Sequence, residues 1–223
     1  MFETLVKIKD DIWLSLGQTA LMVFSSLAIA IVLGGALGLF LFATSNRLFV
    51  KNMVLNQLVG VILNVIRSVP FLILMIFLLP LSKWIVGTKI GSTAVIVPLS
   101  IAATAFFARL AEASFAGVSH GVLEAAVASG AKKSRIIFQI LIPEAFASLV
   151  KNITVTAISI LGYSAMAGLV GGGGLGDLAY RYGYQRYQTE VMIVCVVILI
   201  VLVQLTQWLG DIIVKRLNRK NLS

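Results

Sequence analysis

The chain has 223 residues, of which 59% are hydrophobic and only 12% are charged. A soluble domain of this size needs a mostly polar surface, so the composition excludes a soluble enzyme, a disordered tail and a fibrous protein. The mean hydropathy of +1.01 agrees with that exclusion. The sequence therefore predicts an integral membrane protein.

The remaining counts exclude several kinds of site. One cysteine and one histidine allow no intrachain disulfide, no Cys-x-x-Cys site and no histidine cluster for a metal. The net charge of +9 would indicate nucleic-acid binding in a soluble protein. In a membrane protein the cytoplasmic loops collect Lys and Arg, so we expect no nucleic-acid partner.

Five apolar regions follow one another along the chain. Runs without Asp, Glu, Lys or Arg cover residues 12–46, 90–108, 152–176 and 191–210, and the region 52–82 is interrupted only by Arg67. Each is long enough for the roughly 20 residues that a spanning helix needs. The sequence predicts an all-α polytopic membrane protein, one transmembrane domain over residues 1–223, with five spans at 14–43, 57–81, 90–112, 149–171 and 190–213.

The basic residues are divided unevenly between the two sides of these spans. With the N-terminus outside, the inside segments hold eleven of them: Arg47, Lys51, Arg109, Lys132, Lys133, Arg135, Lys151, Lys215, Arg216, Arg219 and Lys220. The outside segments hold six: Lys7, Lys9, Lys83, Lys89, Arg181 and Arg186. This asymmetry predicts an N-terminus outside and a C-terminus in the cytoplasm.

Arg67 is the one charge within an apolar region, and charges inside a membrane are functional candidates by default. Alternatively, the second span begins near Ser68, and Arg67 reaches back to the inner interface. Pro70 favours a break at this point, because proline kinks a helix and frees backbone carbonyls. We favour a gate-like structural position for Arg67 and Pro70 over direct contact with a ligand.

The segment between the third and fourth spans, residues 113–148, mixes polar and apolar residues at helical spacing. A helix-forming run is interrupted at Gly130, and an apolar stripe follows over residues 136–141. Pro143 is expected to end this second helix or to turn the chain before the fourth span. The pattern predicts a small cytoplasmic projection that either receives another protein or lies on the inner leaflet.

Six residues of this segment match a known motif. Glu124-Ala125-Ala126, Gly130, Ile140 and Pro143 stand at the spacing E-A-A-x3-G-x9-I-x-L-P, with Ile142 in place of leucine. The segment thus resembles the EAA loop of ABC importer permeases. The resemblance implies that the loop seats in a cleft of an ATP-hydrolysing partner and transmits the closure of that partner to the membrane helices.

Residues 64–71, 162–168 and 170–176 also resemble the methionine-uptake members of that family. This resemblance implies a type I importer fold and transport of D- or L-methionine, or a close analogue, across a bacterial inner membrane. It further implies a homodimer, two ATPase subunits on the cytoplasmic side and a substrate-binding protein outside. The rival is an ion-gradient-driven transporter or channel, which usually carries inverted repeats and buried acidic residues.

The chain has no motif of its own for ATP. No glycine is followed by lysine, so the G-x-x-x-x-G-K-[ST] loop that cradles phosphates is missing. We therefore expect a permease that is not an enzyme and holds no cofactor, with ATP bound by a partner subunit. The run from Gly171 to Gly174 predicts a flexible or tightly packed hinge.

Tyr163, Ser164 and Met166 lie within the fourth apolar run. A phenol, a hydroxyl and a thioether would suit a pathway for methionine, since they combine polar groups with a soft apolar surface. Ordinary helix packing is the alternative, because the neighbouring glycines and alanines allow close contact. The other four tyrosines lie beyond this span, in residues 180–187, as an interfacial belt or a landing surface for the binding protein.

Overall fold

The structure is a computed structural model that describes residues 8–46 and 48–220. All the regular structure of these residues is helical, which confirms the all-α prediction. Lys7 and Arg47, which contribute to the charge asymmetry of the loops, lie outside the described residues. The α-helices are α2 (Lys9–Ile29), α3 (Gly35–Ser45), α4 (Met53–Ser68), α5 (Phe71–Val86), α6 (Ser92–Ala116), α7 (His120–Ala128), α8 (Lys133–Ile136), α9 (Ile142–Ala167), α10 (Gly174–Leu178) and α11 (Thr189–Lys220).

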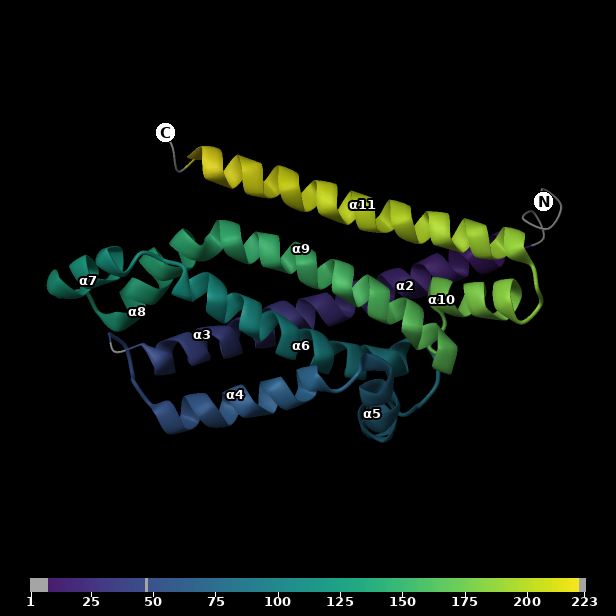
Figure 1. The fold of residues 1–223 in the computed structure, drawn as a ribbon, viewed down its shortest axis with the longest axis horizontal. Helices are drawn as coiled ribbons and strands as arrows, with labels where there is room; N and C mark the ends of the chain where they lie inside the picture. Colours follow the sequence, from purple (N-terminus) through teal and green to yellow (C-terminus); the bar gives the residue numbers. More distant parts are fainter. Residues whose placement is uncertain (1–7, 47, 221–223) are drawn as a thin grey trace.

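Four helical runs in the described part are long and apolar enough to cross a membrane: Lys9–Ser45, Ser92–Ala116, Lys133–Val170 and Thr189–Leu217. The remaining expected span, residues 57–81, consists of α4 and α5, which meet at an angle of 110° (Figure 1). The break falls at Val69-Pro70, where the sequence predicts one. Val69 is extended because the ring of the following proline disfavours the helical conformation there.

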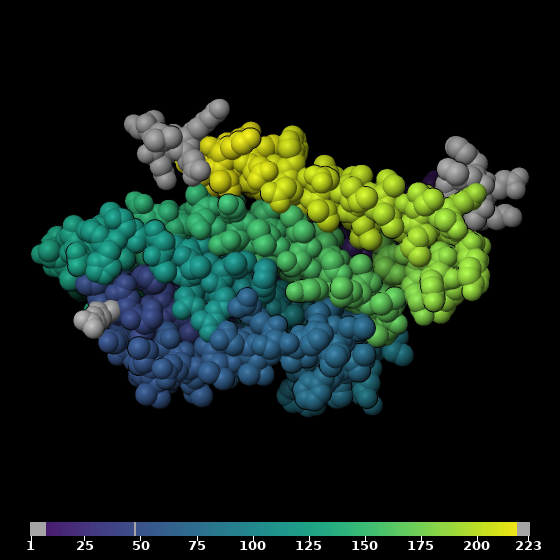
Figure 2. Space-filling view, viewed as in Figure 1, coloured from purple at the N-terminus to yellow at the C-terminus, as the bar shows by residue number. Residues whose placement is uncertain are grey.

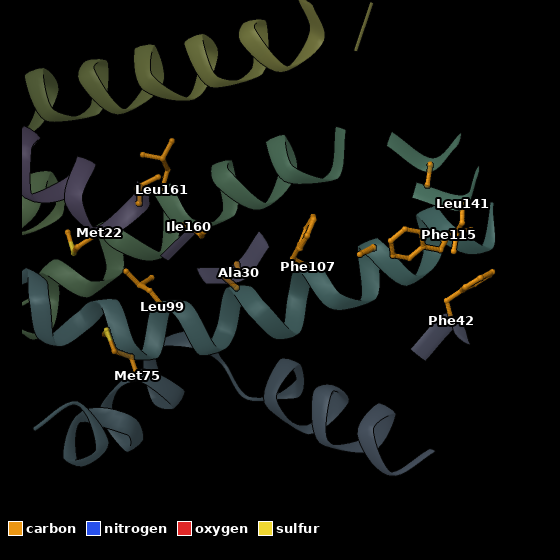
Figure 3. Packing of buried hydrophobic residues seen from close by; sticks show 14 of the residues in the cluster. Met22, Ala30, Phe42, Met75, Leu99, Phe107, Phe115, Leu141, Ile160 and Leu161 are labelled. Atoms are coloured by element: carbon orange, nitrogen blue, oxygen red, sulfur yellow. The ribbon is translucent and has the colours of Figure 1, made fainter. Parts of the chain in front are cut away.

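α6 is the central helix, packed on α2, α3, α4, α5 and α9. Its side chains Leu99 and Phe107 are almost fully buried and meet Met22, Met75 and Ile160 in one core (Figure 3). The core lies inside the helix bundle, while large apolar side chains also cover much of the outer surface. On α11, which forms one edge of the molecule in Figure 2, Ile193, Ile200 and Trp208 are more than half exposed, as expected for contact with lipid.

The first helical run, Lys9–Ser45, approaches α6 closely through two glycines, Gly34 and Gly38. A Cβ atom on Gly34 would stand 2.9 Å from the Thr104 carbonyl oxygen, and one on Gly38 would stand 2.6 Å from the Ala108 carbonyl oxygen. Such small-residue contacts let two membrane helices pack backbone to backbone. The spacing of the two glycines therefore sets the distance between the first helix and the central one.

The expectation that Pro143 ends a helix is wrong. α8, a π-helical turn at Ile137–Leu141 and α9 form one continuous run from Lys133 to Val170. Pro143 stands in the first turn of α9, and the wider turn before it accommodates the ring and the missing N–H. The second half of the predicted loop and the fourth span are therefore one element, with no boundary at residues 148–149.

Candidate functional site

A cavity of about 640 Å³ lies beside the break between α4 and α5. It brings together the break, the start of α5, the middle of α6 and the end of α9. Its lining residues are Ile66, Arg67, Val69, Pro70, Phe71, Leu72, Leu74, Ala102, Phe106, Tyr163, Met166 and Leu169. Two of the three residues predicted on the fourth span, Tyr163 and Met166, and both residues predicted at the break, Arg67 and Pro70, share this one cavity.

Aromatic stacking joins α5 to α9 in the wall of the cavity. The rings of Phe71 and Tyr163 have centroids 4.4 Å apart and planes 15° apart. Met166 stands one helical turn further along and is 47% exposed. The wall therefore combines flat aromatic surfaces with a flexible thioether, a surface that suits an apolar side chain of similar size.

Ser164 does not belong to the cavity. Its side chain is 1% exposed, and its Oγ donates a hydrogen bond of 2.8 Å to the carbonyl oxygen of Leu161 on its own helix. Successive helical residues are rotated by about 100°, so Ser164 points away from the wall that Tyr163 forms. Of the three predicted pathway residues, the structure thus separates Ser164 from the other two.

Arg67 lies in the last turn of α4, exposed on the cavity, with its guanidinium carbon 5.9 Å from the ring centroid of Phe106. The helix begins at Met53, so Arg67 stands about 21 Å along it at 1.5 Å per residue. α4 supplies sixteen helical residues up to Ser68, and the chain bends by 110° directly after it. Phe106 is near the middle of α6, so the exposed Arg67 side chain lies level with the middle of the central helix.

Arg109 holds α4 against α6. In the sequence it counts only among the basic residues of the inside segments. The Arg109 guanidinium donates 2.8 Å to the Gly60 carbonyl oxygen and 3.1 Å to Asn64 Oδ1, and it pairs with Glu112 at 2.8 Å. The three-residue spacing of Arg109 and Glu112 in the sequence indicates an ion pair, because residues three apart lie on one face of a helix. The hydrogen bonds to Gly60 and Asn64 thus hold α4, whose last turn lines the cavity, against α6.

The first residues of the predicted coupling loop, 113–116, belong to the last turn of α6, and α7 follows from His120. Within its motif Ala126 is 8% exposed and contributes to the core, while Glu124 and Ala125 are exposed. Gly130 ends the helix with a φ of 76°, and the Ala131 N–H bonds back to the Ala126 carbonyl oxygen at 3.3 Å. This is the left-handed cap that favours glycine, so the bend expected at Gly130 is present.

The second half of the loop is tied to the connection between α3 and α4 and to the core. Lys133 Nζ donates to the Phe49 carbonyl oxygen in the connection between α3 and α4, and Ile136 is fully buried. Ile140 is partly buried, and Pro143 is exposed. The motif therefore presents Glu124, Ala125, Gly130 and Pro143 on the surface, while its apolar members anchor it.

At the opposite end of the bundle, the glycine run is tightly packed. Gln18 Oε1 accepts a hydrogen bond of 2.8 Å from the Gly174 N–H, and Thr19 Oγ1 accepts one of 2.9 Å from the Leu175 N–H. A Cβ atom on Gly172 would stand 2.8 Å from Val95 Cγ2. Of the two forms of hinge that the sequence leaves open, the packed one is present.

The tyrosine-rich segment follows this run. The Tyr182 hydroxyl donates 2.7 Å to Asp11 Oδ2, and this hydrogen bond raises the pKa of the phenol above its ordinary value. Arg181 pairs with Asp177 at 2.8 Å, and Tyr184 and Tyr187 are 64% and 88% exposed. The segment is therefore attached to the start of α2 through Tyr182 and presents Tyr184 and Tyr187 on the surface.

Comparisons with known proteins identify the family. The description "Binding-protein-dependent transport system inner membrane component" belongs to the family model that matches residues 30–219. A Vibrio cholerae protein named probable D-methionine transport system permease protein MetI is 47% identical over 203 residues, which cover 91% of this chain and 90% of that protein. The Bacillus subtilis methionine import system permease protein MetP is 43% identical over 180 residues, 81% of each chain.

The fold agrees with these relatives. A solved structure described as an inward-facing conformation of the MetNI methionine ABC transporter matches with a TM-score of 0.91 at 39% identity, over 95% of this chain and 98% of that one. The fold class, a type I importer permease with four long apolar helices and one broken one, is therefore the predicted one. This chain belongs to the family of binding-protein-dependent transport system inner membrane components, the permease subunits of ABC importers.

Proposed function

We propose that this chain forms the membrane pathway of an ATP-driven importer for methionine, D- or L-, or a close analogue. The observation that carries the proposal is the cavity of about 640 Å³, in which Phe71, Tyr163 and Met166 provide aromatic and thioether surface. Sulfur–aromatic and apolar contacts suit the side chain of methionine. The names of the relatives from Vibrio cholerae and Bacillus subtilis support the same substrate.

A second copy of the chain completes the pathway in this proposal. The cavity is open on one side, where Met166 and Leu169 are 47% and 49% exposed. The exposed face continues along α9 through Gly162 and Val155 to Lys151, which share one side of a helix. A two-fold axis along this face would close the cavity with its own copy and is the commonest symmetry of soluble oligomers.

The partners lie at the two ends of the bundle. The α7–α8 loop and the C-terminal part of α11 are at one end in Figure 1, and the start of α2 and the segment after α10 are at the other. Two ATPase subunits dock at the loop on the cytoplasmic side through the exposed Glu124, Ala125, Gly130 and Pro143, while Ala126 and Ile140 pack on the core and hold the loop in place. The binding protein docks on the tyrosine-rich end, outside, and the N-terminus lies on that outer side.

In this mechanism ATP binding closes the two partner subunits and moves the two loops together. Because α8 and α9 are one run, the movement reaches Tyr163 and Met166 without an intervening joint. The pathway opens outward in the closed state and inward after hydrolysis, so the nucleotide shifts a population between two arrangements. α4 and α5 line the cavity together with α9, and the chain bends sharply between them at Arg67 and Pro70. In this proposal the bend acts as the gate.

The test is transport by the reconstituted complex. Proteoliposomes that contain the chain and its ATPase partner are supplied with the binding protein, radioactive methionine and ATP. We expect uptake that requires both ATP and the binding protein. Unlabelled D-methionine, L-methionine or both should compete with the radioactive substrate. Uptake by the chain alone, driven by an ion gradient and insensitive to ATP, would contradict the proposal.

A further inference from the structure

The guanidinium of Arg67 is the cationic group on the wall of the cavity. Among the described residues, no acidic side chain forms an ion pair with it, and the contact that it does make is with the face of Phe106 at 5.9 Å. Arginine stays charged at every physiological pH. A permanent positive charge therefore lines a mostly apolar cavity, level with the middle of α6. A charge within an apolar helical region of a membrane protein is a functional candidate.

Two other arginines of the described chain are paired with acidic side chains. Arg109 follows Phe106 by three residues on α6. It is paired with Glu112 and also donates hydrogen bonds to Gly60 and Asn64. Arg181 is paired with Asp177 at the outer end. Arg67, unlike these two, has no ion pair and no hydrogen bond to the described residues. Arg67 has its donor groups left over for an anion that enters the cavity.

The start of α5 adds a second source of positive potential. The N–H groups of Ile73 and Leu74 donate to the Pro70 carbonyl oxygen at 2.9 and 3.0 Å, whereas those of Phe71 and Leu72 have no hydrogen-bond partner in the described part of the chain. Both residues line the cavity with Arg67. The positive end of a 16-residue helix thus faces the same space as the guanidinium.

The chemistry of the expected substrate supplies a matching anion. An amino acid carries a carboxylate beside its side chain, and guanidinium and carboxylate form paired hydrogen bonds. We propose that Arg67 binds the carboxylate of the transported amino acid, while Phe71, Tyr163 and Met166 contact its side chain. This inference rests on the proposed function and assigns to Arg67 a contact with the substrate in addition to its place at the gate.

A site-directed labelling experiment tests this role inside the cavity alone. Met166→Cys places a thiol on the wall, and the native Cys195 is fully buried. The rate at which a maleimide labels this thiol is measured in the complex with the ATPase partner, in the presence of methionine or of methioninol, which lacks the carboxylate. Leu169→Cys is the second labelling position, in case Met166→Cys does not fold.

We expect methionine to slow labelling several-fold and methioninol to have little effect. Arg67→Gln should abolish the protection by methionine, and Arg67→Lys should keep part of it, because lysine retains the charge without the planar fork. Lys83→Gln is the matched control, since it removes an exposed charge at the end of α5 away from the cavity lining. It should leave the protection unchanged.

Two failures are distinguishable. If the unmodified complex shows no ATP-dependent methionine uptake, the proposed function is wrong. If the complex transports methionine but methionine does not protect either thiol, the inference about Arg67 is wrong. It is equally wrong if Arg67→Gln keeps the full preference for methionine over methioninol.

Discussion

Pro143 and Tyr163 lie on one helix, 20 residues apart, which corresponds to about 30 Å at 1.5 Å per residue. One is the last residue of the exposed loop motif, and the other stacks on Phe71 in the wall of the cavity. A single rigid element therefore joins the surface that we assign to the ATPase partner with the space that we assign to the substrate. This relationship is the structural basis of the coupling mechanism.

The loop motif depends on one backbone conformation. Gly130 has a φ of 76°, and a Cβ atom at this position would meet no other atom within 4 Å. Asparagine tolerates this conformation and valine does not, at a cost of about 1–2 kcal/mol. Gly130→Val should therefore weaken co-purification of the ATPase subunit, whereas Gly130→Asn should preserve it. Equal retention of the partner by both variants would contradict a role for the bend.

The break at Pro70 and the bend at Gly130 could be predicted, because each depends on one residue with a restricted or special backbone. The run through Pro143 could not, since a proline is compatible with the first turn of a helix and the preceding π turn leaves no mark in the sequence. The sequence also does not show which way the Ser164 side chain points. Whether a serine hydroxyl faces a pathway or packs inside the bundle depends on the positions of the neighbouring helices.

The sequence predicts only part of the cavity lining. Tyr163 and Met166 stand out by their chemistry and Arg67 as the one charge in an apolar region, and the structure brings the three together. Phe106, which faces Arg67, stands in an apolar stretch in which nothing distinguishes it from packing residues such as Phe107. Long-range contacts of this kind depend on the relative rotation of two helices, and hydrophobic periodicity reports only an average face.

The tie between Tyr182 and Asp11 fixes the outer segment to the first helix. Tyr182→Phe removes a hydrogen bond of 2.7 Å to a carboxylate and should lower the free energy of unfolding by about 1 kcal/mol, since the pair is only partly buried. Thermal unfolding in detergent measures the difference. Tyr184→Phe is the control, because it keeps the ring that stacks on Tyr180 and should have no effect.

The contribution of this tie has a defined pH dependence. The Asp11 hydrogen bond raises the pKa of Tyr182 above its ordinary value of 10.0. A raised pKa means that the stabilisation is fully present below pH 10 and is lost as the pH rises through the folded-state pKa. The difference between the wild type and Tyr182→Phe should be constant from about pH 6 to 9 and should shrink above about pH 10. A difference that grows in alkali would contradict this assignment.

Close packing of the first helix on α6 depends on Gly38. Gly38→Ala places a methyl group 2.6 Å from the Ala108 carbonyl oxygen and should destabilise the bundle by about 1–3 kcal/mol. Gly17→Ala is the matched control, because no atom lies within 4 Å of the added group and alanine favours a helix. Unfolding midpoints in detergent compare the two. Similar losses for both variants would show that glycine at position 38 is not needed for packing.

The central claim is that α8 and α9 transmit the movement of the ATPase as one element. Ile158→Gly with Ser159→Gly, about one helical turn before Tyr163, weakens the helix between the loop and the cavity by about 2 kcal/mol relative to alanine at both positions. The matched variant replaces both residues by alanine. The measurement is the number of methionine molecules imported per ATP hydrolysed in proteoliposomes. We expect this ratio to fall several-fold in the glycine variant, with ATP hydrolysis and partner binding retained. An unchanged ratio would contradict the account.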